Sequence, residues 1–287
     1  MYFVLTSCAS NKDTKFTKTE KSVSIHHKDK VLWTFNCHKG VMKPHFHPLA
    51  ATDGTNFTDI RPRDHVWHYG MWFCFKFINS INYWEERNGK SVGTTFVKNF
   101  NAIQKSGKTI ITVDLIYYHK KETILISEKR KIFVSTPDKD GNYTIDWSSN
   151  FKAKADIIID RTPLPGEKNG KGYGGYAGLS LRCNKNLRSW SYLNDKGESK
   201  THGKPTKWIN FSGKINNKDY SITFFDHSKN MSYPSSVYTH KGMPYFSPAF
   251  LFRKSQSYKK GKTFSLKYKL LIENGKANPE KYNKLAQ

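Results

Sequence analysis

Alternation of apolar and polar residues recurs along the whole chain, and it limits the possible folds more than any other feature. The stretch "TFSLKYKLLIE" places Phe264, Leu266 and Tyr268 on one side, with lysines and a serine on the other. "FKAKAD" repeats the pattern from Phe151 onward. A period of two residues is typical of a strand with one buried face. The pattern therefore predicts an all-β protein.

Further candidate strands cover most of the chain. They span residues 22–27, 30–36, 41–47, 70–78, 93–99, 109–118, 123–135, 142–149, 176–183, 206–211, 220–226 and 247–253. Turn signals such as "SGK" at 106–108 and "KDGN" at 139–142 separate many of them. About fourteen strands exceed an immunoglobulin-type domain and favour one large two-sheet antiparallel β-sandwich. The clear helix candidate is C-terminal, where Asn278 can cap and Pro279 takes the first helical position.

The N-terminal segment differs from the rest. "LTSC" ends in Cys8 and has the form of a bacterial lipoprotein cleavage box, although only seven residues precede the cysteine. We interpret residues 1–20 as a lipoprotein-signal remnant and polar tether, and residues 21–287 as a single β-sandwich catalytic domain. Lipidation of Cys8 would anchor the protein in the periplasm or at the outer membrane. The alternative is a chance match in a disordered start.

The charge is strongly positive, with 48 Lys and Arg against 23 Asp and Glu and a net charge of +25. The lysines are spread along the chain, which is typical of a solvated surface. The alternative is a polyanionic partner, either nucleic acid, anionic lipid or an acidic polysaccharide. No nucleic-acid-binding motif accompanies the charge, so we expect no nucleic-acid partner. Four cysteines without a CxxC pair are too few for a disulfide framework.

Residues 43–73 concentrate titratable and aromatic side chains. This stretch holds four histidines, three basic residues, three aspartates and two tryptophans in 31 residues. His45 and His47 would share one face of a strand, because side chains two residues apart point the same way. Asp64 stands beside His65, where a carboxylate can orient an imidazole. A core does not need so many polar groups, so we predict a functional site here.

Two other segments look like parts of this site. "GYGGYAGLSLR" contains a nominal G-x-G-x-x-A dinucleotide fingerprint, but no helical pattern follows it. We therefore expect its glycines to allow close approach of the backbone, with Tyr176 and Arg182 near a ligand. "ITFFDHSKN" ends a candidate strand in Asp226 and His227, a position that often carries function. The alternatives are a tight loop and a simple turn.

These residue types suit acid–base chemistry on an anionic sugar. Histidines transfer protons, arginines bind carboxylate or sulfate groups, and tryptophans stack on pyranose faces. A divalent metal held by His45 and His47, with Asp64 or His68, is the alternative. The spacing permits such a site, but the zinc signature HExxH is absent. We therefore expect no cofactor.

The order of these motifs resembles that of the DUF6807 family, also labelled PmoA-like. The blocks "KPHFHP", "RPRDHVWHYGMWF", "GGYAGLSLR" and "FFDHSKN" follow one another within roughly residues 30–273. The family typically reads D-H-P-H-H-R-G where this chain reads D-H-V-W-H-Y-G. The matching residues are Asp64, His65, His68 and Gly70, and the departures are Val66, Trp67 and Tyr69. The departures put the family's usual ligand preference in doubt here.

The resemblance implies a galactose-mutarotase type of β-sandwich and a role in carbohydrate degradation by marine Bacteroidetes. The family is similar to a dehydratase that acts on ulvan, a sulfated uronate polysaccharide of green algae. That enzyme removes water from a non-reducing-end uronic acid and leaves a 4,5-unsaturated uronate. We therefore expect a hydro-lyase whose partner is an acidic, sulfated oligosaccharide.

Such an elimination needs a base, an acid and positive charge near the carboxylate, because removal of the C5 proton creates an enolate-like dianion. The expected catalytic residues are His45, His47, Asp64, His68 and Tyr176. The expected substrate-binding residues are Lys43, Arg61, Arg63, His65, Trp67, Trp72, Trp84, Arg182, Asp226 and His227. In this hypothesis His45 or His47 handles one proton, His68 or Tyr176 handles the other, and Asp64 orients a histidine.

Other functions use the same residues. An elimination or hydration of a 3-keto-glycoside would employ the same histidines, and a metal would help to polarise the ketone. A non-catalytic glycan-binding lipoprotein would need only the tryptophans and basic residues. A glycosidase with paired carboxylates is disfavoured, because the cluster is rich in histidine rather than glutamate.

Overall fold

The computed structural model describes residues 13–119, 122–240 and 242–286, which form twenty strands and one short helix. The strands are β1 (Thr14–Lys18), β2 (Ser22–His27), β3 (Lys30–Asn36), β4 (His45–Leu49), β5 (Met71–Cys74), β6 (Phe77–Ile78), β7 (Ile81–Asn82), β8 (Thr94–Lys105), β9 (Lys108–His119), β10 (Thr123–Ser135), β11 (Tyr143–Ala153), β12 (Ile157–Asp160), β13 (Gly178–Arg182), β14 (Arg188–Asn194), β15 (Trp208–Ile215), β16 (Lys218–Asp226), β17 (Val237–Thr239), β18 (Tyr245–Pro248), β19 (Gln256–Tyr258) and β20 (Thr263–Asn274). The helix is α1 (Pro279–Leu285).

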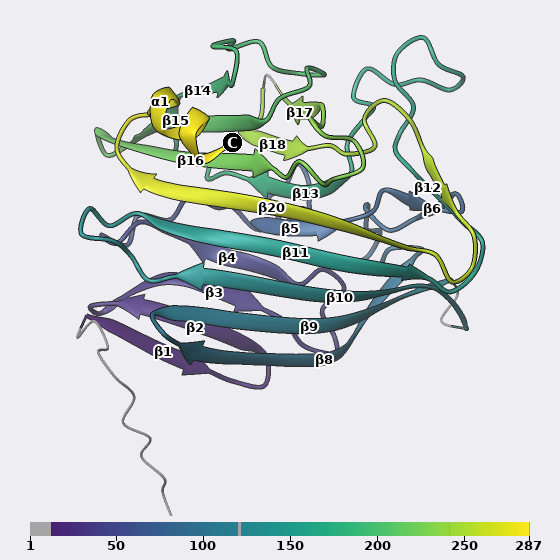
Figure 1. Ribbon diagram of the computed structural model, residues 1–287, viewed down its shortest axis with the longest axis horizontal. Helices are drawn as coiled ribbons and strands as arrows, with labels where there is room; N and C mark the ends of the chain where they lie inside the picture. The colour runs from purple at the N-terminus through teal and green to yellow at the C-terminus, as the bar shows by residue number, and fades with distance from the viewer. Residues whose placement is uncertain (1–12, 120–121, 241, 287) are drawn as a thin grey trace, which may run out of the picture.

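Two eight-stranded sheets pack face to face (Figure 1). Sheet A has the strand order β1-β2-β3-β4-β5-β13-β18-β17, and sheet B has the order β14-β15-β16-β20-β11-β10-β9-β8. In Figure 1 sheet B faces the viewer and sheet A lies behind it. The predicted all-β sandwich of two antiparallel sheets is confirmed.

A third, four-stranded sheet has the order β19-β12-β6-β7, and the sequence pattern did not predict it. Its strands are only two to four residues long, too short for an alternating pattern to stand out. We call it sheet C. It lies at the right-hand end of the sandwich in Figure 1, and the β12–β13 loop starts from it.

Aromatic side chains fill the space between sheets A and B. Phe73 of β5 contacts Phe151 of β11 across the sandwich, with ring centroids 5.5 Å apart. Phe246 of β18 meets Phe224 of β16 at 5.0 Å. Loss of one such buried ring to alanine costs about 3–5 kcal/mol, so these contacts hold the sheets together. The predicted apolar face of β20 is part of this core, because Leu266, Tyr268 and Leu270 are buried.

The outer face of sheet A carries the residues that the core does not use. The ladder pairs His45 with Trp72, Trp72 with Ser180, and Arg182 with Tyr245, so these side chains share one face. Phe46, next to His45 in the chain, points inward against Phe35 at 4.8 Å. The alternation of side chains thus directs the predicted strand histidines away from the core.

Some predicted boundaries are wrong. Residues 14–18 were expected in a polar tether but form β1, because they pair with β2 and Phe16 packs on the core. Cys8 and its cleavage box lie outside the described residues. Only the start of the predicted strand 247–253 is a strand, since the chain turns after Pro248 and buries the apolar run that follows. Residues 41–44 form a loop ahead of β4.

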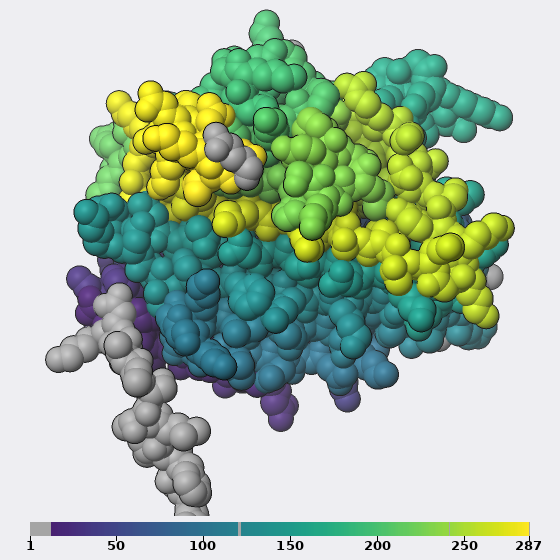
Figure 2. Space-filling view, viewed as in Figure 1, coloured from purple at the N-terminus to yellow at the C-terminus, as the bar shows by residue number. Residues whose placement is uncertain are grey.

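The predicted C-terminal helix is confirmed as α1. Asn278 caps it, because its side-chain oxygen accepts a hydrogen bond from the Lys281 amide at 3.0 Å. Tyr282 packs on Trp208 of β15 with ring centroids 5.2 Å apart, and α1 lies against sheet B at the upper left of Figure 2. The described residues contain no helix that is long and apolar enough to span a membrane.

Candidate functional site

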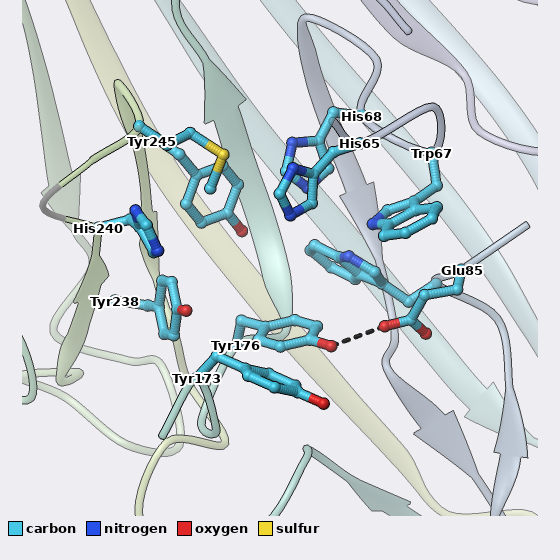
Figure 3. A pocket seen from close by; sticks show the side chains of 11 residues that line it. His65, Trp67, His68, Glu85, Tyr173, Tyr176, Tyr238, His240 and Tyr245 are labelled. Atoms are coloured by element: carbon cyan, nitrogen blue, oxygen red, sulfur yellow. Dashed lines mark hydrogen bonds between the residues drawn. The ribbon is translucent and has the colours of Figure 1, made fainter. Parts of the chain in front are cut away.

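A cavity of about 390 Å³, here called the aromatic pocket, opens on the outer face of sheet A (Figure 3). Four segments supply its walls: the β4–β5 loop, the segment after β7, the β12–β13 loop, and β17–β18 with their connection. The lining residues are His65, Trp67, His68, Trp84, Glu85, Tyr173, Tyr176, Tyr238, His240, Met243 and Tyr245. Its size and its aromatic walls suit a sugar-sized ligand.

Stacked rings form the floor of the aromatic pocket. The His68 ring stacks on the Tyr245 ring, with centroids 5.1 Å apart and an interplanar angle of 21°. Beneath it lies Trp72, 5.0 Å away, which is fully buried and is not part of the lining. The ring centroids of Trp84 and Tyr176 lie 5.1 Å apart, so Trp84 links the floor to the wall that carries Tyr176. The predicted aromatic residues Trp67 and Trp84 therefore line the pocket, while Trp72 supports it.

His68 is a buried proton-transfer group of the pocket. Its side chain is buried, and its Nδ1 atom has no hydrogen-bond partner within the described residues. Burial lowers the pKa of His68 well below its ordinary value, and the nearby charges of His65 and Arg182 lower it further. The imidazole is therefore neutral at pH 7, when it can accept a proton.

Asp64 ties His65 to Arg182 at the edge of the pocket. Arg182 Nη2 donates to both carboxylate oxygens of Asp64, at 3.0 and 2.8 Å, and His65 Nδ1 donates to Oδ2 at 2.9 Å. Burial raises the pKa of Asp64, but these two donors outweigh it and keep the carboxyl ionised. The predicted contact between Asp64 and a histidine is present. Arg182 is buried, and its Nε and Nη1 atoms lack partners among the described residues.

Glu85 is a pocket residue that the sequence reasoning missed. The Tyr176 hydroxyl donates to Glu85 Oε1 at 2.7 Å, as the dashed line in Figure 3 marks. Asn82 donates to the other oxygen at 2.6 Å, and the Lys76 ammonium binds the same oxygen. Burial raises the pKa of Glu85, but Lys76 outweighs this and holds it below the ordinary value. The sequence feature that could have identified Glu85 is "YWEER", in which two glutamates directly follow Trp84.

Glu86 neutralises two of the cations that were expected to bind substrate. Its buried carboxylate accepts from Lys43 Nζ at 3.0 Å and from Arg61 Nη1 at 2.7 Å. Neither cation lines the aromatic pocket. Arg63 is exposed and also lies outside the lining. Two members of the predicted cationic clamp lie next to the pocket. Lys43 donates to the carbonyls of Trp67 and Trp84 behind the pocket wall, and Arg182 pairs in register with Tyr245.

His45 and His47 lie outside the aromatic pocket. His45 is buried beneath Tyr69, 5.1 Å from its ring, and its Nδ1 donates to the Lys43 carbonyl at 2.8 Å. Burial lowers its pKa to about 4. His47 is half-buried and hydrogen-bonds Thr58 at 2.9 Å. The structure does not bring these two histidines together with His65 and His68, because the β4–β5 loop folds between them and the cavity.

Asp226 and His227 belong to a different surface. They line a separate cavity of about 710 Å³ on the outer face of sheet B. Asp226 accepts from Asn230 Nδ2 at 2.6 Å and from the Ser235 amide at 2.7 Å, which fixes the turn after β16. Their predicted place in the same site as the loop histidines is therefore wrong, because β16 belongs to the opposite sheet. Among the described residues, no group of three or more His, Cys, Asp or Glu side chains is arranged to hold a metal ion.

Several solved structures resemble the chain at low sequence identity. One is a galactose mutarotase related enzyme from Lactobacillus acidophilus, 8% identical, with a TM-score of 0.38 over 92% of this chain and 100% of that one. Another is a protein from Synechocystis sp. PCC 6803, 9% identical, with a TM-score of 0.38 over 96% and 100% of the two chains. A galactose mutarotase-like protein from Lactobacillus casei ATCC 334 is 10% identical, with a TM-score of 0.26 over 91% and 100%.

These likenesses are distant, and the fold assignment rests on the chain's own strands. No functionally curated protein matches the chain by sequence. The family profile gives a direct result, since DUF6807, a family of unknown function, matches residues 22–287. That span contains the described parts of both large sheets except β1, and it confirms the resemblance first noted in the motifs: the chain belongs to the DUF6807 family.

Proposed function

We propose that this protein is a carbon–oxygen lyase that removes water from the non-reducing-end uronic acid of an acidic oligosaccharide. One observation carries the proposal: two proton-transfer groups, neutral His68 and the Tyr176 phenol, lie on opposite sides of a sugar-sized aromatic pocket (Figure 3). Elimination needs such a pair, because one group removes a proton while another protonates the leaving oxygen.

In the proposed reaction His68 takes the C5 proton and Tyr176 gives a proton to O4. The C5–H and C4–O bonds break, a C4–C5 double bond forms, and one water leaves. Burial raises the pKa of Tyr176, and the carboxylate of Glu85 raises it further, so the phenol keeps its proton at neutral pH. The lowered pKa of His68 keeps the base unprotonated under the same conditions.

The developing negative charge on the substrate carboxylate needs a positive partner. Arg182 meets this need best, because it is buried beside His68 and has two unpartnered nitrogen atoms among the described residues. His65 stacks on His68 at 4.6 Å and is held by Asp64, so it can donate a further hydrogen bond when protonated. Asp64 is thus a positioning residue for both groups.

A second candidate is elimination from a 3-keto-glycoside. The observation that favours it is the small number of free cations near the pocket, since Glu86 neutralises Lys43 and Arg61 and Asp64 binds Arg182. A proton next to a ketone is acidic without a carboxylate to neutralise. His68 and Tyr176 would play the same parts, and the substrate would carry no charge at the reacting ring.

The test mixes the purified protein with ulvan-type oligosaccharides that end in a saturated uronic acid. We expect the ultraviolet absorbance of an unsaturated uronate to rise and the mass of the oligosaccharide to fall by one water. Tyr176→Phe should abolish the reaction while binding persists. Tyr173→Phe is the matched control, because this pocket tyrosine has no hydroxyl partner among the described residues.

The other outcomes separate the alternatives. Turnover of a 3-keto-glycoside, with no reaction of the uronate, would support the second candidate. Binding of either sugar without turnover, unchanged in His68→Asn and Tyr176→Phe, would refute both eliminations and leave a glycan-binding protein.

A further inference from the structure

A second cavity continues from the aromatic pocket. It has a volume of about 720 Å³ and shares three lining residues with the first cavity, namely Tyr173, Tyr238 and His240. Its other walls are β14, the loop between β14 and β15, and the end of β17. The remaining lining residues are Gly172, Trp190, Ser191, Tyr192, Ser199, Lys200, Thr201, His202, Lys204 and Thr239. We call it the rim cavity, because β14 and β17 are the edge strands of sheets B and A.

Trp190 gives the rim cavity a supported aromatic face. Its ring lies 5.6 Å from Phe211 and 5.3 Å from Tyr192, and the side chain stays half-buried, so part of the ring remains accessible. The β14–β15 register shifts between Arg188 and Ser191, beside Trp190. Irregularities of this kind redirect side chains at sheet edges. Tyr173, 55% exposed, supplies a second aromatic surface at the junction with the aromatic pocket.

The charge of the rim cavity differs from that of the aromatic pocket. Its lining holds two lysines and two histidines and no Asp or Glu, whereas Glu85 lines the aromatic pocket. Lys204 pairs with Glu198 at 2.6 Å, just outside the lining. Lys200 is exposed and makes no ion pair within the described part of the chain. An aromatic face beside an unpaired ammonium suits a sugar that carries an anionic group.

We propose that the rim cavity is a binding subsite for the sugar residue that follows the one in the aromatic pocket, and that it selects a residue bearing a sulfate or carboxylate group. The inference rests on the proposed function, because that function assigns the terminal residue to the aromatic pocket. The shared side chains make the two cavities adjacent. An oligosaccharide that leaves the aromatic pocket past Tyr173, Tyr238 and His240 therefore enters the rim cavity. Trp190 stacks on the ring, and Lys200 pairs with the anion.

Calorimetric titration of the full chain tests the subsite with size-defined, uronate-ended ulvan-type sugars. The probes are the free terminal uronic acid, a sulfated disaccharide with this uronic acid at its non-reducing end, and the same disaccharide after desulfation. Tyr176→Phe serves as the background, so that turnover does not disturb the titration. Trp190→Ala and Lys200→Ala are compared with Lys196→Ala, an exposed lysine of the neighbouring turn that does not line the cavity.

We expect the disaccharide to bind about tenfold more tightly than the free uronic acid, because its second residue adds a stacking contact with Trp190 and an ion pair with Lys200. Trp190→Ala should remove most of this gain without changing the affinity for the free uronic acid, and Lys196→Ala should leave the gain intact. Desulfation identifies the anion. If it removes the effect of Lys200→Ala, the bound group is a sulfate; if that effect persists, the group is a carboxylate.

Equal affinity for the uronic acid and the disaccharide, or a disaccharide affinity that neither variant changes, overturns the subsite even if the disaccharide loses water normally. A length effect that depends on Trp190, without any loss of water by the protein with an intact Tyr176, supports the subsite and refutes the dehydratase. If neither sugar binds, the result refutes both the subsite and the dehydratase.

Discussion

His45 should make the protein sensitive to mild acid. The residue is 4% exposed, its Nδ1 donates to the Lys43 carbonyl at 2.8 Å, and burial lowers its pKa from 6.5 to about 4. The unfolded chain therefore binds a proton at this residue at higher pH than the folded chain does. Folding stability from His45 is fully present above pH 6.5 and is lost as the pH falls toward 4.

The size of the effect follows from the difference in pKa. A difference of about 2.5 pH units, at 1.36 kcal/mol per unit, gives roughly 3 kcal/mol of stability lost between neutral pH and pH 4. That is a large share of the 5–15 kcal/mol by which typical domains are stable, so unfolding by urea should report it clearly. Other buried histidines, such as His68, add to the acid sensitivity of the wild-type protein.

The variant His45→Asn isolates this contribution. Asparagine keeps a donor near the position of Nδ1, so the hydrogen bond to Lys43 can persist, but it cannot be protonated. The smaller side chain lowers stability by the same amount at every pH. The difference in free energy of unfolding between wild type and variant should therefore shrink, and then reverse or vanish, as the pH falls through 6.5 toward 4. A difference that stays constant across this range would refute the reasoning.

Three further changes test other parts of the structure. Glu86→Gln should lower the free energy of unfolding by about 3–5 kcal/mol, because it leaves buried Lys43 without its carboxylate; a loss close to zero in urea titrations would contradict the pairing. Gly174→Ala should lower both thermal stability and sugar binding, since an added Cβ would lie 2.1 Å from a carbonyl of the same loop, whereas the Cβ of Gly172→Ala meets nothing within 4 Å and should leave thermal stability unchanged. Asn278→Ala should cost about 1 kcal/mol through loss of the cap on α1, measured by urea unfolding with Asn278→Ser as the conservative control.

The strands could be predicted because the sequence of a half-buried strand alternates between apolar and polar residues. The face of β20 that carries Phe264 and Leu266 was identified in this way, and so was the shared face of His45 and His47. The pattern fails for β7 and β19, which have only two and three residues. It also fails for the run that follows Pro248, where the apolar residues are buried in a turn.

The composition of the pocket could not be predicted, because it depends on contacts between distant segments. Tyr238 and His240 come from the far end of sheet A, and their sequence, "VYTHKG", has no special spacing. The pairing of Asp64 with Arg182 joins residues 118 positions apart. Asp226 and His227 had a spacing as suggestive as that of Asp64 and His65, yet they lie on the other sheet. Spacing predicts which residues share an element, but not which elements meet.

The charge at the site is governed by the two adjacent glutamates rather than by the many basic residues of the chain. Glu85 and Glu86 follow Trp84, and their side chains turn to different neighbours: Glu86 binds Lys43 and Arg61, while Glu85 faces the aromatic pocket and accepts from Tyr176. The net charge of +25 therefore says little about the charge of the aromatic pocket. Lys200 of the rim cavity makes no ion pair among the described residues, so an anionic group of a ligand would be recognised beside the aromatic pocket.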